Sequence, residues 1–132
     1  MSKQYRVWVR FLSEMQYVLQ LNDDGSVMTD GYDYCIEKEA IDLMRYSNWY
    51  DNEGNLICEG DIVKDHIGTG VVKYSLEYDD FRVSYGDGTA KWLSDYNISN
   101  ERKSIQVVGD MFSTYKLIMT IGLNDENKTV GT

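Results

Sequence analysis

Apolar and polar residues alternate along several short runs of the chain, which is the pattern of half-buried β-strands. Residues 5–11 and 15–21 both alternate, and the short polar step Ser13-Glu14 lies between them. They predict an N-terminal β-hairpin whose far end closes at residues 22–25, Asn-Asp-Asp-Gly. In the first strand one face would carry Tyr5, Val7, Val9 and Phe11, and the other Arg6, Trp8 and Arg10.

The apolar residues of segment 36–47 fit both the period of a helix and the period of a strand. Ile36, Ala40, Leu43 and Met44 have helical spacing, yet residues 41–46 also alternate as in a strand. We expect a short helical turn near residues 37–41 that runs into a strand near residues 42–47.

The second half of the chain has the pattern of a small β-barrel. Four β-rich runs follow at roughly ten-residue spacing, at residues 61–65, 70–74, 81–85 and 89–93. The step Gly86-Asp87-Gly88 tolerates positive φ and predicts a hairpin, and residues 105–112 supply a last strand. The chain is therefore predicted to be mainly β, with a small barrel at about residues 54–112 and the N-terminal hairpin and short helical segment packed on it.

Length and composition favour one domain with one core. The chain has 132 residues, of which 42% are hydrophobic, enough to fold without disulfides or a metal. Residues 122–132 are polar and lack periodicity, so the domain is assigned to residues 1–121 and the rest to a disordered tail. No long apolar run or signal peptide is present, and Cys35 and Cys58 are too far apart for a redox motif, which favours a cytoplasmic protein.

The residues of common catalytic and metal sites are sparse. His66 is the single histidine, in a segment that resembles a loop, and the two cysteines are distant from one another. Gly68-Thr69-Gly70 precedes a strand, whereas a phosphate-binding loop opens a helix, so it is interpreted as a hairpin turn. We expect no enzyme activity, no metal site and no cofactor.

Several segments together resemble one known family. Met44-Arg45-Tyr46 and residues 51–63 (DNEGNLICEGDIV) are similar to the stretch that marks the YopX-like proteins of bacteriophages and prophages. Arg6-Val7-Trp8 with Met15, Trp92-Leu93, and residues 107–112 (VVGDMF) agree with that family, so the resemblance spans about residues 5–118. It implies a phage-encoded intracellular protein with an SH3-like barrel and a biochemical role that is undefined.

The most specific part of this resemblance also has a structural explanation. In Glu59-Gly60-Asp61, glycine permits a left-handed turn and the aspartate accepts hydrogen bonds from that turn before the next strand begins. We interpret the three residues as a structural turn, with a ligand site as the alternative.

Aromatic residues lead to the first functional hypothesis, a protein-interaction or self-assembly module. Tyrosine occurs eleven times, and the candidate contact residues are Trp8, Trp49, Tyr50 and Trp92. Trp8 lies opposite the apolar face of its strand, so either it is exposed for a contact or the strand is sandwiched between the barrel and the helical segment. The exposed case predicts a homo-oligomer, or docking on a host or phage protein.

Charge bears on the alternative hypotheses. The net charge of −9, from 22 acidic and 13 basic residues, disfavours nucleic-acid binding. Lys64, Lys73, Arg82 and Lys91 nevertheless come from four neighbouring runs and could form a basic stripe, unless they only solvate an outer face. An acidic surface that mimics nucleic acid is a further alternative, and no membrane partner is expected.

Overall fold

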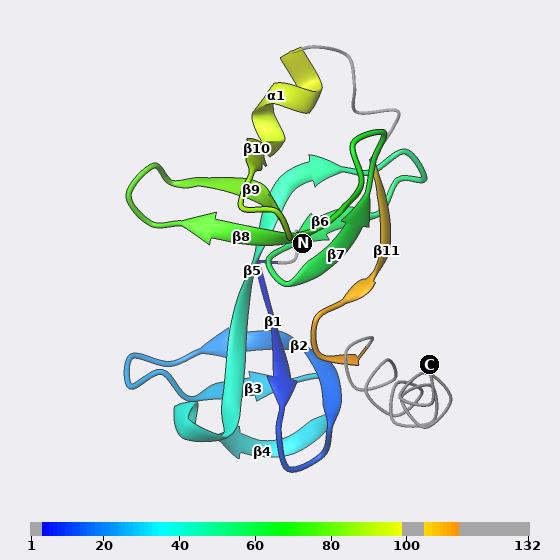
Figure 1. Ribbon diagram of the computed structural model, residues 1–132. Coiled ribbons are helices and arrows are strands. Elements are labelled where there is room, and N and C mark those ends of the chain that lie inside the picture. Colours follow the sequence, from blue (N-terminus) through cyan, green and yellow to red (C-terminus); the bar gives the residue numbers. More distant parts are fainter. Residues whose placement is uncertain (1–3, 99–104, 114–132) are drawn as a thin grey trace, which may run out of the picture.

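The structure is a computed structural model in which residues 4–98 and 105–113 are described. Two antiparallel sheets form two lobes, and one long strand, β5, runs from the lower lobe into the upper one (Figure 1). The chain is thus mainly β, as predicted. The domain boundary at residue 121 and the tail at residues 122–132 lie outside the described residues.

The first sheet has six strands in the order β4-β3-β2-β1-β5-β6. These strands are β1 (Tyr5–Val9), β2 (Glu14–Leu21), β3 (Val27–Thr29), β4 (Tyr32–Ile36), β5 (Ile41–Tyr50) and β6 (Leu56–Cys58). The predicted N-terminal hairpin is confirmed, with Val9 opposite Glu14. Its far turn also closes as predicted, since the Asn22 amide donates to the Ser26 carbonyl at 2.9 Å.

The ambiguous segment contains both a helical turn and a strand. A 3-10 helix, η1 (Lys38–Ala40), leads directly into β5, which confirms the predicted order of the two elements. The prediction that this helical segment packs on the barrel is wrong, because Ala40 packs against buried residues of the first sheet. β5 is also longer than expected, since its second half leaves β1 and pairs with β6.

The second sheet has five strands in the order β10-β9-β8-β7-β11. They are β7 (Asp61–Lys64), β8 (Thr69–Ser75), β9 (Asp80–Tyr85), β10 (Ala90–Trp92) and β11 (Gln106–Asp110). All five strands predicted in the second half of the chain are found. The glycine hairpin is confirmed as well, with the Tyr85 amide donating to the Thr89 carbonyl at 2.9 Å.

The predicted barrel at residues 54–112 does not close in the described part of the chain. β10 and β11 lie at opposite edges of the second sheet and do not pair with each other. β10 is only three residues long and continues at once into α1 (Leu93–Ile98), so it is too short to pair with β11 and close a barrel. The start of the predicted barrel is also misplaced, because residues 56–58 form β6 of the first sheet.

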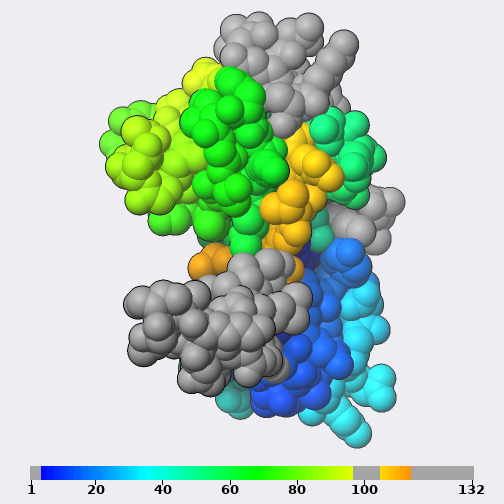
Figure 2. Space-filling model, turned by 45° about the vertical axis from the view of Figure 1, so that its right-hand side comes forward, coloured from blue at the N-terminus to red at the C-terminus, as the bar shows by residue number. Residues whose placement is uncertain are grey.

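Buried side chains of the described residues form two separate clusters rather than one core. The cluster of the first sheet consists of Val7, Val9, Val27, Ile36 and Ile41. The cluster of the second lobe consists of Ile57, Val63, Val72, Phe81, Val83, Tyr85, Leu93, Tyr96 and Ile105. In Figure 2 the blue strands of the first sheet lie in the lower lobe and the green to orange strands of the second sheet in the upper lobe. No helix in the described residues has the length and apolar character needed to cross a membrane.

Candidate functional site

The turn Glu59-Gly60-Asp61 lies where the two sheets meet. Gly60 has φ of +88°, the left-handed conformation predicted for it. Its amide donates to the Val72 carbonyl and its carbonyl accepts from the Met111 amide, both at 2.8 Å. The turn is therefore hydrogen-bonded to β8 and to the residue that follows β11, while Glu59 donates its amide to the Arg45 carbonyl of β5 at 2.9 Å.

Asp61 forms a buried ion pair across this junction. The Arg6 Nη2 from β1 lies 2.7 Å from Asp61 Oδ1, and the Cys58 amide donates to Asp61 Oδ2 at 2.8 Å. Burial raises the pKa of Asp61, while the Arg6 charge and these hydrogen bonds act in the opposite direction. Because Arg6 belongs to the first sheet and Asp61 to the second, the pair ties the lobes together.

Two further buried carboxylates organise the second lobe. Asp51 accepts hydrogen bonds from the amides of Glu53, Asn55 and Val107. Asp65 accepts from the amides of Ile67 and Gly68 and from the hydroxyls of Tyr85 and Tyr96. The sequence does not distinguish these two aspartates from ordinary turn carboxylates, because some of their hydrogen-bond partners are distant in the chain. Val107, for example, is 56 residues from Asp51.

Burial would raise the pKa of Asp65, but the hydrogen bonds from Tyr85, Tyr96 and the two amides outweigh it and hold the pKa below its usual range. Burial and Asp65 in turn raise the pKa of Tyr85 to about 12, so its hydroxyl remains a donor at neutral pH. The cluster is a closed hydrogen-bond network with a structural role.

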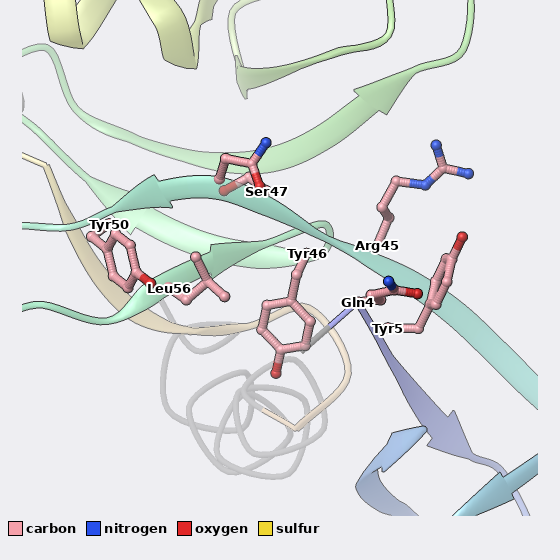
Figure 3. Close-up of a pocket in the computed structure, with 8 residues that line it drawn as sticks. Gln4, Tyr5, Arg45, Tyr46, Ser47, Tyr50 and Leu56 are labelled. Atoms are coloured by element: carbon pink, nitrogen blue, oxygen red, sulfur yellow. The ribbon is translucent and has the colours of Figure 1, made fainter. Parts of the chain in front are cut away.

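A pocket of about 450 Å³ lies beside β5 where it leaves the first sheet (Figure 3). The Arg45 guanidinium lies 5.8 Å from the Tyr5 ring and 4.3 Å from the Tyr74 ring. Figure 3 shows Arg45 beside Tyr5, with Tyr46 pointing to the other side of the strand. The described lining residues are Gln4, Tyr5, Arg45, Tyr46, Ser47, Asn48, Tyr50 and Leu56. This lining holds polar groups suited to binding but no carboxylate, thiol or imidazole that would supply acid, base or nucleophile.

The four predicted aromatic contact residues are not brought together. Trp8 is half-buried and stacks on Phe112, just after β11, with ring centroids 5.6 Å apart. Trp49 is half-buried against the cluster of the second lobe. Tyr50 lines the pocket beside β5, and Trp92 lies on the second sheet.

Trp92 belongs to an aromatic group at one end of the second sheet. Its ring meets the Tyr78 ring edge-on at 5.5 Å, and Tyr78 is 65% exposed. Leu76, in the same turn between β8 and β9, is 82% exposed. Leu76 and Tyr78 were not among the predicted contact residues, although two large apolar residues between the predicted strands at residues 70–74 and 81–85 were a usable signal.

The four predicted basic residues do not form one stripe. Lys73 and Arg82 are direct cross-strand neighbours, and Arg82 is opposite Trp92, so these three share one face. Lys91 is opposite the buried Val83 and places its Nζ 4.5 Å from the Tyr96 ring, on the other face. Lys64 pairs with Thr69 of β8. Thr69 lies four residues before Lys73, so Lys64 and Lys73 are separated by about 13 Å along the strand.

Reactive groups in the described part of the chain are poorly placed for chemistry. Burial raises the pKa of the Cys58 thiol far above its usual range, so it stays protonated. His66 is exposed in the loop between β7 and β8. Within residues 4–98 and 105–113 no three His, Cys, Asp or Glu side chains cluster in a way that could hold a metal ion.

Comparisons with known proteins agree with this architecture. The chain is similar over 87% of its length to the crystal structure of protein EF1440 from Enterococcus faecalis, of which 96% is covered, with a TM-score of 0.55 and 20% sequence identity. That likeness concerns the fold. No curated protein matches the chain. The model of the YopX protein family matches residues 4–119, and the chain therefore belongs to the YopX protein family.

Proposed function

We propose that this YopX protein is a non-enzymatic interaction module that self-associates through the end of its second sheet. The contact would use Leu76, Tyr78 and Trp92 together with Lys73 and Arg82, which we call the hairpin surface. The exposed Leu76 and Tyr78 beside Trp92 are the observation that carries this proposal.

Exposed apolar side chains of this size favour burial in a contact. Leu76 and Tyr78 leave most of their surface in water, and Trp92 is half-buried beside them. Aromatic residues with a neighbouring arginine are enriched in protein interfaces, where they contribute much of the binding energy. The hairpin surface has this composition.

The charges around the hairpin surface favour a second copy as the partner. Lys73 and Arg82 lie near Glu77, Asp79 and Asp80 in the same hairpin. In a twofold contact the same patch meets itself, so basic side chains of one copy can face acidic side chains of the other. This local balance of sign avoids the repulsion that a net charge of −9 would otherwise cause.

Size-exclusion chromatography with light scattering, over a wide range of protein concentration, tests the proposal. We expect the wild type to exceed the monomer mass and Leu76→Asp to be monomeric. Leu19→Asp is the matched control, because Leu19 is 69% exposed but lies in the first sheet, and it should keep the wild-type mass. A monomeric wild type at every concentration would refute self-association.

Nucleic-acid binding is the weaker alternative. Only Lys73, Arg82 and Trp92 adjoin one another, and the acidic residues of the same hairpin offset their charge. A gel-shift assay at low salt with single-stranded and double-stranded DNA and RNA should show no complex. Two further parts of the proposal come from the sequence resemblance. The protein would act in the cytoplasm on behalf of a phage or prophage, and its second sheet would be related to SH3-like barrels.

A further inference from the structure

The edge strand β4 of the first sheet is open to solvent at its side and on both faces. It is the terminal strand in the order β4-β3-β2-β1-β5-β6. Asp33, Tyr34 and Cys35 are all exposed, and Tyr34 reaches 72% exposure. Because successive side chains of a strand point to opposite faces, three consecutive exposed residues mean that neither face is covered.

The backbone of β4 offers hydrogen-bonding groups to another strand. β4 pairs with β3 at Tyr32 and Ile36, with an irregularity in register between them. In the described part of the chain, the backbone groups of residues 33–35 form no hydrogen bond to any other element. An edge strand in this state is a template for an added strand, a known mode of peptide recognition. Figure 1 places β4 at the outer end of the lower lobe, away from the second sheet.

An aromatic group adjoins this edge. Phe11, in the turn after β1, meets the Tyr32 ring at 5.4 Å, and Tyr32 meets the Tyr34 ring at 5.9 Å, both edge-on. Phe11 is 57% exposed. In Figure 2, side chains in the light blue to cyan of this segment protrude from the lower lobe. An added strand would therefore find an apolar face on the side of Tyr32 and Tyr34.

Charge indicates which strand fits. Residues 4–44 contain eight acidic and three basic side chains, and two of the basic ones, Arg6 and Arg10, are already in ion pairs. Asp33 lies in β4, on the face opposite Tyr32 and Tyr34, and Glu37 follows the strand. A second copy of β4 would set these carboxylates near one another, and like charges across strands are unfavourable.

We propose that β4 binds an extended basic segment of a partner protein, in which apolar and basic residues alternate. Its backbone would pair with β4, its apolar side chains would contact Tyr32 and Tyr34, and its basic side chains would contact Asp33. This site is on the other lobe from the hairpin surface, so it does not depend on self-association.

A blocked peptide of alternating lysine and valine, titrated into isotope-labelled protein at low salt, tests this proposal by NMR. We expect shifts and slowed amide exchange confined to β4 and its neighbours. The same peptide with N-methylated backbone keeps its charge and side chains but cannot pair as a strand, and it should not bind. Asp33→Lys and Tyr34→Thr should each weaken binding about fivefold.

Leu76→Thr is the control variant, because it alters the hairpin surface and should leave peptide affinity unchanged. Equal binding of the N-methylated peptide, shifts located away from β4, or the lack of any binding would each overturn the proposal. Loss of self-association in Tyr34→Thr with Leu76→Asp unaffected would also overturn it, since β4 would then be the self-contact.

Discussion

Two glycines with the same left-handed backbone differ in what surrounds them. Gly60 has φ of +88° and Gly54 has φ of +85°. A Cβ added at Gly60 would lie 2.8 Å from Met44 Sδ, whereas at Gly54 it would meet nothing within 4 Å. Both glycines therefore need a left-handed backbone, but of the two only Gly60 is closely approached by a side chain of the other lobe.

Gly60→Ala should therefore cost more stability than Gly54→Ala. The left-handed conformation alone costs a residue with a Cβ about 1–2 kcal/mol, which we expect for Gly54→Ala. Crowding against Met44 should add about 1 kcal/mol at Gly60, because a packed site must shift to admit the methyl group. Urea unfolding of both variants measures the difference, and equal losses would show that Met44 moves aside freely.

Short-range signals allowed much of the fold to be predicted. The strands at residues 61–64 and 80–85 combine alternation with turn glycines, and both were found. β3 and β6, with three residues each, were not predicted because so short a run carries no period. α1 was missed for a related reason, since its six residues follow β10 without a break.

The candidate sites were harder to predict than the elements. Trp8 was identified from the alternation of β1, but its stacking on Phe112 depends on the course of a segment more than a hundred residues later. The edge position of β4 follows from strand order, which periodicity does not specify. Residue types therefore indicated an adhesive surface, whereas its location required the topology.

At the scale of elements, Asp65 connects three parts of the second lobe. It lies at the end of β7 and accepts hydrogen bonds from Tyr85 at the end of β9 and Tyr96 in α1. The described part of α1 has six residues, and so short a helical segment depends on such contacts for its stability. The carboxylate therefore helps to hold this helix against the sheet.

Asp65→Asn should destabilise the protein in a pH-dependent way. The pKa of Asp65 is lowered in the folded state, so its contribution is complete above the unfolded pKa of about 4 and is lost as the pH falls through the folded pKa. We expect a loss of about 1–3 kcal/mol at pH 7 that shrinks below pH 4. Urea unfolding of wild type and variant at several pH values tests this, and a constant difference would contradict it.

At the scale of the whole molecule, the lobes have separate buried clusters but share a strand and an ion pair. β5 spans ten residues, about 33 Å, and pairs with β1 in the lower lobe and β6 at the junction. The pair between Arg6 and Asp61 adds a second connection. These links should make the two lobes unfold together.

Single-tryptophan variants that keep Trp8 in the first sheet or Trp92 in the second should report the same urea midpoint. Arg6→Met or Asp61→Asn should each cost about 3 kcal/mol, because either leaves a buried polar group without its partner. In those backgrounds we expect the two midpoints to separate. The double variant should lose less than the sum of the two single losses. Separate midpoints in the wild type would show that the lobes are independent.

The shared strand also limits how the chain can be divided or built up. A fragment that stops near Tyr50 would contain the partners of only the first half of β5, leaving Ser47 to Tyr50 without β6. β11, which completes the second sheet, comes much later in the chain than β5, so the second lobe is completed after the first. Neither lobe is therefore a natural unit for separate expression, and a circular permutation is better placed in the turn at residues 86–88 than anywhere within β5.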